Sequence, residues 1–280
     1  MTILTALLQG TKLLEEEAVS VPRLTAEVLL THALHQERAY LYAHPEEELS
    51  EIAWIHYGRY LHERMKGKPT QYITGRQEFY GRDFRVNSDV LIPRPETEHL
   101  VEAAVAHIHA RDLVVDIGTG SGAIAVTLAL ETPAHIIASD ISTAALQVAQ
   151  SNAQQLSAQV GFLACDLLDA YRDGSINVLV SNPPYVPRTD EPNLQREVRD
   201  YEPPVALFGG PTGLEVYQKL SVEASRVLRP HGWLLLELGY NALNPVRAML
   251  ESDWTDIDIV PDLAGFPRVI AARLHSATSE

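Results

Sequence analysis

The sequence has little of what disulfide-bonded, metal-binding and membrane proteins require. Cys165 is the only cysteine among 280 residues, so no internal disulfide can form, and we expect a buried thiol beside a strand. The histidines are spread without ligand spacing, which predicts no metal site. No apolar run approaches the ~20 residues that cross a bilayer, and no basic then apolar signal pattern follows Met1. We therefore expect a cytoplasmic protein without a membrane span.

Positive charge is also scarce. The chain has 22 Lys and Arg residues against 37 Asp and Glu residues, a formal net charge of −15. This balance opposes binding to a long polyanion, so we expect no direct nucleic-acid substrate unless a local basic patch overrides it. Arg64, Lys66 and Lys68 form the best candidate patch, but cations at these positions also fit the C-terminus of a helix.

The rest of the composition is that of a packed protein. A hydrophobic content of 46% suits one or two packed domains. Residues 76–93 alternate apolar side chains around Gly81 and predict a β-hairpin that joins the domains. From residue 94 to residue 280 strands alternate with helices, which indicates a doubly wound α/β sheet. Residues 1–75 predict a bundle of three or more short helices, because apolar side chains recur at helical spacings: Ile3, Leu7, Leu8, Leu14, Leu24, Val28, Leu29, Trp54, Tyr57, Leu61 and Met65.

A glycine-rich loop follows the first predicted strand of this sheet. The strand is expected at Leu113–Asp116, and a helix is expected to begin at Ala123. Alternate glycines let the backbone turn sharply and approach a ligand, with the helix N-terminus beneath it. The spacing Gly-x-Gly-x-Gly lacks the third glycine position of the dinucleotide fingerprint. We predict that the loop contacts a nucleoside cofactor through Gly118, Thr119, Gly120, Ser121 and Gly122.

Acidic residues follow the next two predicted strands. Asp140 ends the strand at His135–Ser139, about 20 residues after the glycine loop, where an acid can accept hydrogen bonds from both ribose hydroxyls of an adenosine. Asp166 and Leu167 end the strand at Val160–Cys165 and are predicted to bracket the adenine. Each acid taken alone fits a helix cap or a solvated loop better than a ligand contact. The order of strand, glycine loop, helix, strand and acid favours the nucleoside site.

The most informative residues are Asn182-Pro183-Pro184-Tyr185, which follow a buried strand predicted at Ile176–Ser181. The two prolines stiffen the turn before any ligand arrives. The Asn182 oxygen and the Pro183 carbonyl can accept both hydrogens of a planar NH2 group, while the Tyr185 ring stacks on the conjugated system. The alternative is an Asn-Pro turn that only closes a strand. Beside a nucleoside site, we favour a cradle for an amide or an exocyclic amine.

These motifs carry a family resemblance. The glycine loop, Asp140 and the Asn-Pro-Pro-Tyr turn resemble S-adenosylmethionine-dependent methyltransferases that act on planar amino groups. Among these enzymes, the sequence most specifically resembles the PrmC/HemK family, the release factor glutamine N5-methyltransferases. Stretches along most of the chain carry this likeness: Gln71–Gly75, Glu78–Gly81, Leu91–Glu98, Arg199–Pro203, Leu236–Gly239 and Asp262–Arg268.

The resemblance implies a complete functional assignment. The fold is expected to be a Rossmann-like sheet of seven strands whose last strand is antiparallel. Asn182, Pro183 and Tyr185 are expected to be catalytic, and Asn182 to contact both cofactor and substrate, together with Pro184. The cofactor is S-adenosylmethionine, the product is S-adenosylhomocysteine, and the substrate is the glutamine of the Gly-Gly-Gln motif in a release factor. Residues 1–75 are expected to dock that partner, residues 94–280 to perform the transfer, and the protein to be monomeric.

Two further segments have competing interpretations. Arg94 and Glu96 are assigned to the substrate site because the resembled family places this run beside cofactor and substrate, although Pro95 and Glu96 also begin an ordinary helix. The segment 199–204 is expected to cover the acceptor site, or to be a charged surface loop.

Two other functions stay open from the sequence. A DNA or RNA base methyltransferase would present the same planar amine to the cradle, although the acidic charge counts against it. A cofactor-binding adaptor without activity would share the fold, although the intact Asn-Pro-Pro-Tyr turn counts against it.

Overall fold

The computed structural model describes residues 1–250 and 252–275. It divides into two compact units, one comprising residues 1–76 with 195–201, and the other comprising residues 77–194 with the chain from 202 onward. Among the described residues, no helix is both long enough and apolar enough to span a membrane.

The first unit is helical, as the sequence predicts. Its N-terminal helices are α1 (Ile3–Glu16), α2 (Pro22–Leu34), α3 (Arg38–Ala43), α4 (Glu51–Met65) and α5 (Thr70–Thr74). Thr2 and Ser50 cap α1 and α4, because their hydroxyls accept from backbone amides three residues on. The predicted stripe is buried at most positions, but Leu8, Leu24 and Trp54 are exposed. Leu8 lies about 100° further round α1 than the buried Leu7 and faces away from the core, so part of the predicted core was wrong.

A distant segment completes this helical unit. Helix α9 (Arg196–Tyr201) groups with the N-terminal helices although it follows the Asn-Pro-Pro-Tyr turn in sequence. Arg64 is buried and pairs with Glu197 at 2.5 Å. The Tyr201 hydroxyl donates to the backbone oxygen of Lys66 at 3.1 Å. These contacts are long-range, so sequence periodicity gave no sign of them.

The predicted hairpin is present but shorter than expected. Strands β1 (Arg76–Phe79) and β2 (Arg82–Arg85) form a two-stranded sheet across Tyr80 and Gly81, both with positive φ. Residues 86–94 then lack regular strand structure. The side chain of Asn87 accepts from the amide of Asp89 at 3.0 Å, and this turn ends the extended pairing.

The second unit contains the seven-stranded sheet, in the order β10-β11-β9-β6-β3-β4-β5. Strands β6, β3, β4 and β5 run parallel, β9 pairs parallel to β6, and β11 pairs antiparallel to both β9 and β10. The predicted antiparallel last strand is therefore confirmed. The bounds are β3 (Leu113–Ile117), β4 (His135–Asp140), β5 (Val160–Ala164), β6 (Ile176–Ser181), β9 (Leu228–Glu237), β10 (Trp254–Pro261) and β11 (Pro267–Leu274).

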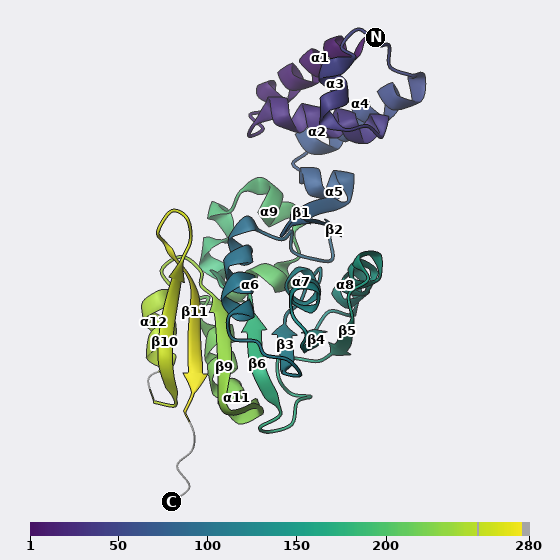
Figure 1. Cartoon of the computed structure of the whole chain (residues 1–280). Helices are drawn as coiled ribbons and strands as arrows, with labels where there is room; N and C mark the ends of the chain where they lie inside the picture. Colours follow the sequence, from purple (N-terminus) through teal and green to yellow (C-terminus); the bar gives the residue numbers. More distant parts are fainter. Residues whose placement is uncertain (251, 276–280) are drawn as a thin grey trace, which may run out of the picture. The chain divides into compact units, whose positions relative to one another are not determined.

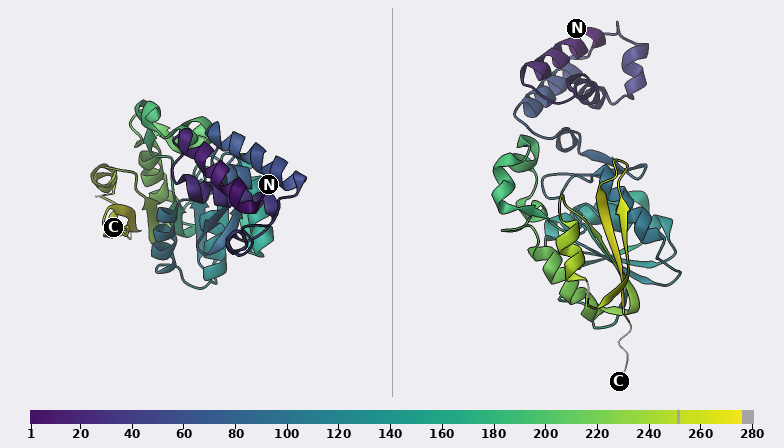
Figure 2. Two further views of the ribbon diagram at one scale, coloured as in Figure 1. Left: turned by 90° about the horizontal axis from the view of Figure 1, so that it is seen from above. Right: turned by 90° about the vertical axis from the view of Figure 1, so that its left-hand side faces the viewer.

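Helices cover both faces of this sheet (Figure 1). Helices α6 (Glu98–Val105), α7 (Ala123–Glu131) and α8 (Thr143–Leu156) lie on one face, and α11 (Glu215–Val227) and α12 (Leu243–Met249) lie on the other. Neighbouring strand residues alternate between the two cores, since Val114 packs into one and Val115 into the other. Figure 2 shows the long hairpin of β10 and β11, in yellow, from further directions.

Between β5 and β6 the chain returns across the sheet, so the direction in which new strands are added reverses at β3. After β3 the chain adds β4 and β5 on one side, and it then returns to place β6 on the other side of β3. Ligands of open α/β sheets bind at such a switch point, beyond the carboxyl ends of the strands.

Candidate active site

The predicted motifs meet at this edge of the sheet. Ile117, the last residue of β3, aligns with Ser139 of β4 and with Ser181 of β6. The Ser181 hydroxyl donates to the backbone oxygen of Ile117 at 2.8 Å and ties the two strand ends together. The glycine loop, Asp140 and Asn182 therefore leave neighbouring strands at the same level.

The glycine loop has open space beside two of its glycines and is held by a hydrogen bond to the buried end of β3. Gly118 and Gly120 have positive φ, and a Cβ built on either would meet no atom within 4 Å. Beneath them, the Thr119 hydroxyl donates to Asp116 Oδ2 at 2.6 Å. Asp116 is fully buried, and this burial raises its pKa to about 7. Its other carboxylate oxygen, Oδ1, has no hydrogen-bond partner among the described residues.

Two more side chains fix the shape of the loop. Asp140 Oδ2 accepts from the amide of Gly120 at 2.9 Å, and Oδ1 accepts from the amide of Ser142 at 2.8 Å. Asn152 of α8 is completely buried and donates to the backbone oxygen of Ser121 at 2.8 Å. Asp140 thus reaches the glycine loop directly, and Asn152 is a supporting residue that the sequence analysis missed.

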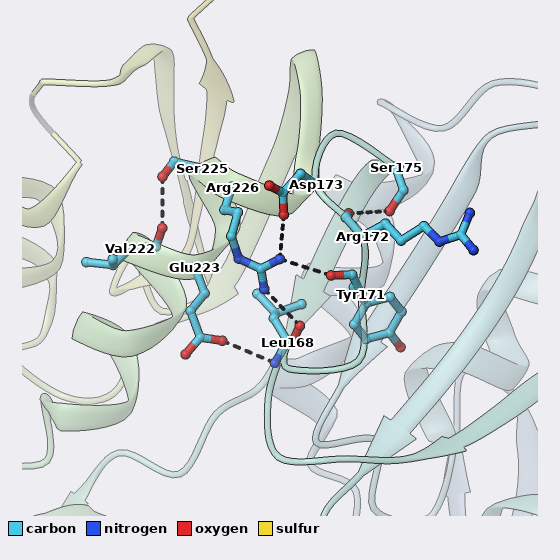
Figure 3. Close-up of polar contacts among 9 residues, drawn as sticks. All are labelled: Leu168, Tyr171, Arg172, Asp173, Ser175, Val222, Glu223, Ser225 and Arg226. Atoms are coloured by element: carbon cyan, nitrogen blue, oxygen red, sulfur yellow. Dashed lines mark hydrogen bonds and ion pairs between the residues drawn. The ribbon is translucent and has the colours of Figure 1, made fainter.

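The loop that follows Asp166 and Leu167 is anchored to α11. Arg226 donates to the backbone oxygens of Leu168 and Tyr171 and pairs with Asp173 at 2.7 Å, while Glu223 accepts from the amide of Leu168 (Figure 3). These contacts fix the loop that follows Leu167, a residue with positive φ. Asp166 itself is exposed. Cys165 is half-buried, not fully buried as expected, because it lies just beyond the end of β5 and its thiol contacts the Leu167 carbonyl at 3.3 Å.

Three glycines enclose the Asn-Pro-Pro-Tyr turn. A Cβ at Gly209 would lie 2.4 Å from the Pro184 oxygen, and one at Gly213 would lie 2.3 Å from the Tyr185 oxygen. A Cβ at Gly239 would lie 2.6 Å from Cδ2 of the Tyr185 ring. No larger residue fits at these positions unless the turn moves. Strands β7 (Val186–Pro187) and β8 (Phe208–Gly210) pair beside the turn and align the first of these glycines.

Polar contacts also reach the turn from two other segments. Asn182 Nδ2 donates to Thr97 Oγ1 at 3.3 Å, and the Thr97 hydroxyl donates to Glu237 Oε2 at 2.6 Å. Burial raises the pKa of Glu237 to about 7 and that of Tyr185 to about 12. The Tyr185 hydroxyl therefore stays protonated at neutral pH, and the residue presents a neutral ring.

Arg94 and Glu96 interact electrostatically with Tyr185 of the turn and with Glu237. Arg94 pairs with Glu202 at 2.5 Å, and Glu202 also accepts from the amide of Ile92 at 3.3 Å. Glu202 is buried, so this end of the 199–204 segment is anchored. Glu96 is exposed, and from the same run it is Thr97 that contacts Asn182.

The sequence analysis gave no role to a set of residues around the turn, namely Thr97, Gly209, Gly213, Glu237 and Gly239. Thr97, Glu237 and Gly239 lie in stretches that carry the family likeness, whereas Gly209 and Gly213 do not. The glycine cluster at 209–213 was visible as a turn signal, but its partner could not be read from one sequence. Among the side chains that the structure describes, no group of three or more His, Cys, Asp or Glu residues is arranged to hold a metal ion.

Comparison with known proteins identifies the family of the chain. The model of the PrmC N-terminal domain matches residues 5–75, and that of the methyltransferase small domain matches residues 95–198. A release factor glutamine methyltransferase of Koribacter versatilis is 47% identical, over 98% of this chain and 99% of the relative. One of Nitratidesulfovibrio vulgaris is 41% identical, over 93% and 91%. A methyltransferase structure from Pyrococcus furiosus has a TM-score of 0.54 at 18% identity, over 70% of this chain and 90% of that one, which concerns the fold alone. The chain belongs to the release factor glutamine methyltransferase family.

Proposed function

We propose that this protein transfers the methyl group of S-adenosylmethionine to the side-chain amide nitrogen (N5) of the glutamine in the Gly-Gly-Gln motif of peptide-chain release factors. The observation that carries the proposal is the position of Asn182-Pro183-Pro184-Tyr185 at the end of β6, next to the glycine loop of β3, in a chain of this family. The other product is S-adenosylhomocysteine. The modification supports translation termination.

The edge of β3 and β4 fits the cofactor. Gly118 and Gly120 leave open space over the backbone. Each Asp140 oxygen accepts one backbone amide, so the carboxylate keeps lone pairs for two ribose hydroxyls. Asp166 and Leu167 are proposed to bracket the adenine. When bound, S-adenosylmethionine supplies an activated sulfonium methyl group and its leaving group.

An amide nitrogen is a poor nucleophile because its lone pair is delocalised into the carbonyl. We assign its alignment to the Asn182 oxygen and the Pro183 carbonyl, which accept the two amide hydrogens and direct the nitrogen along the transfer axis. Their dipoles favour the positive charge that develops on nitrogen. The Tyr185 ring packs against the planar amide. Near-attack positioning of this kind contributes up to about 7–11 kcal/mol in favourable systems.

No strong general base is required in this scheme. The protonated amide that forms is acidic enough to lose its proton to water. This agrees with the content of the turn, where the only titratable side chain is Tyr185, whose pKa burial raises to about 12. Arg94, through its ion pair with Glu202, is proposed to shape the substrate side of the cradle, and Glu96 to contact the substrate.

The helical unit is proposed to select the substrate. A free glutamine offers the same amide as a release factor, so the cradle alone has little means of choosing one glutamine among many. We assign docking of the folded factor to residues 1–75, and remote binding energy would then orient the reacting amide. Since α9 pairs with this unit, removal of residues 1–75 would also strip Glu197 of its partner. The sharper test compares intact factor with a short Gly-Gly-Gln peptide on the whole enzyme, and the peptide should lose both kcat and affinity.

A nucleic-acid substrate has less support. Within the candidate basic patch, Arg64 pairs with Glu197 and Lys68 pairs with Glu63 at 2.7 Å. The deciding experiment incubates the enzyme with labelled cofactor and, separately, with release factor, DNA and tRNA, and then maps the methylated atom by mass spectrometry. Label on the glutamine N5 alone is expected. Label on a nucleic-acid base, or on no substrate, would overturn the proposal.

A further inference from the structure

Three side chains form a directed chain of hydrogen bonds behind the acceptor cradle. Asn182 Nδ2 lies 3.3 Å from Thr97 Oγ1, and Thr97 Oγ1 lies 2.6 Å from Glu237 Oε2. The three residues come from different segments: the end of β6, the turn Pro95–Thr97 before α6, and the end of β9. The alignment of Ser181 with Leu236 brings Asn182 beside Glu237, so strand register creates the contact.

The direction of this chain is set by the one proton of the threonine hydroxyl. When Glu237 is ionised its carboxylate can only accept, so it takes that proton's hydrogen bond and leaves Thr97 Oγ1 with only lone pairs to offer Asn182. A carboxamide has a donating end and an accepting end. The donating end, Nδ2, must therefore face Thr97, and the accepting end, Oδ1, must point away from it.

The opposite orientation is disfavoured by burial. If the Asn182 amide turned over, its oxygen would face the threonine lone pairs and one hydrogen bond would be lost. Thr97 and Glu237 are only 4% and 1% exposed, so water cannot replace the missing partner. An unpaired buried polar group costs about 1–3 kcal/mol. The turned-over amide would also present its own hydrogens to the two hydrogens of the substrate amide.

We propose that Thr97 and Glu237 are positioning residues that fix which end of the Asn182 carboxamide faces the substrate. This inference rests on the acceptor role proposed above for Asn182. It assigns a function to Thr97 and Glu237 that requires no contact with either substrate. Glu237 acts only through Thr97, because it orients the hydroxyl proton.

The test uses a variant that removes the hydroxyl and keeps the shape. Thr97→Val should lower kcat for release factor by about tenfold or more, the factor that corresponds to one lost hydrogen bond of ~1.4 kcal/mol. The KM for S-adenosylmethionine should change by no more than about twofold, because the glycine loop and Asp140 are untouched. Thr97→Ser keeps the hydroxyl and should restore kcat. Glu237→Gln relaxes the direction, since its amide can accept from or donate to Thr97, and adding it to Thr97→Val should cause no further loss.

A matched control is available on α7. Thr127 is completely buried, and its hydroxyl has no hydrogen-bond partner among the described residues. Thr127→Val makes the same chemical change away from the turn, and it should leave kcat unchanged. Wild-type kcat in Thr97→Val would overturn the positioning role, as would an equal loss in Thr97→Ser.

Asn182→Ala, measured alongside, separates this inference from the proposed function. If Asn182→Ala loses turnover while Thr97→Val does not, the positioning role of Thr97 and Glu237 is wrong and the acceptor role of Asn182 stands. If Asn182→Ala keeps wild-type turnover, the acceptor role itself fails.

Discussion

Gly239 provides the sharpest test of how the turn is held. A Cβ at this position would lie 2.6 Å from Cδ2 and 2.8 Å from Cγ of Tyr185. Carbon atoms in contact normally lie about 3.5–4.0 Å apart, so in Gly239→Ala the ring and the backbone must separate by roughly 1 Å. A displacement of about 1 Å can cost ~100-fold in rate. We expect kcat to fall by about that factor, with a loss of about 1–3 kcal/mol in stability from overpacking.

The structure supplies both controls for this experiment. Gly161 lies within β5, outside the proposed docking unit, and a Cβ there would meet atoms only at ordinary contact distances of 3.6 and 3.7 Å. Gly161→Ala should therefore keep wild-type turnover and raise stability by about 0.5–1 kcal/mol. In a Tyr185→Ala background the clash has no partner, so Gly239→Ala should cause little further loss of turnover. Steady-state kinetics with release factor and thermal unfolding measure both effects. A persistent hundredfold loss in that background, or wild-type turnover in Gly239→Ala itself, would refute the reasoning.

Four other outcomes are expected. Asn182→Ala should keep most of its cofactor affinity but lose about a hundredfold or more in kcat, as for one oriented contact at the transition state, and near-wild-type turnover would contradict the mechanism. Tyr185→Phe should be much milder than Tyr185→Ala because the ring survives, and equal losses would move the role to the hydroxyl. Asp140→Ala should raise the KM for S-adenosylmethionine about tenfold or more with a smaller change in kcat, and unchanged affinity by calorimetry would refute the ribose assignment. The raised pKa of Glu237, about 7 against 4.5, makes the folded state bind more protons, so ionisation of Glu237 lowers stability as pH rises from about 4.5 to 7. Glu237→Gln should match the wild type near pH 4 and exceed it by up to about 3 kcal/mol at pH 8, and a pH-independent difference in urea unfolding would count against this.

The place of the candidate site residues in the fold could be predicted because it depends on local signals. The glycine loop, Asp140 and Asn182 each follow an apolar strand directly, and each is carried to the same edge once the strands run parallel. The prolines stiffen the turn through their own rings, without help from the rest of the chain. The antiparallel last strand was also predicted correctly, but that came from family resemblance, not from any pattern in the residues.

What could not be predicted depends on register and packing between distant segments. Thr97 and Glu237 are 140 positions apart in sequence, and neither differs in local pattern from an ordinary helix start or strand end. The role of Gly239 becomes apparent only when the Tyr185 ring lies against it. For residues 199–204, which include the end of α9, the sequence predicts a loop over the acceptor site or a charged surface loop, because the residue that pairs with α9, Arg64, lies in the N-terminal helices. These contacts involve single atoms, whereas periodicity reports only which face of an element is buried.

The many contacts that hold the Asn-Pro-Pro-Tyr turn rigid follow from the chemistry proposed for the site. A poor nucleophile without a general base can be accelerated only by alignment and by fixed dipoles, so rigidity of the turn replaces acid and base groups. Tyr217 illustrates this, since its hydroxyl donates to the Glu237 carbonyl at 2.7 Å and accepts from the Gly239 amide at 3.1 Å. This single side chain fixes the backbone at Glu237, which accepts from Thr97, and at Gly239, which lies against the Tyr185 ring. Because Tyr217 is completely buried, no substrate group needs to contact it, and its contribution to turnover has to pass through the positions of Glu237 and Gly239.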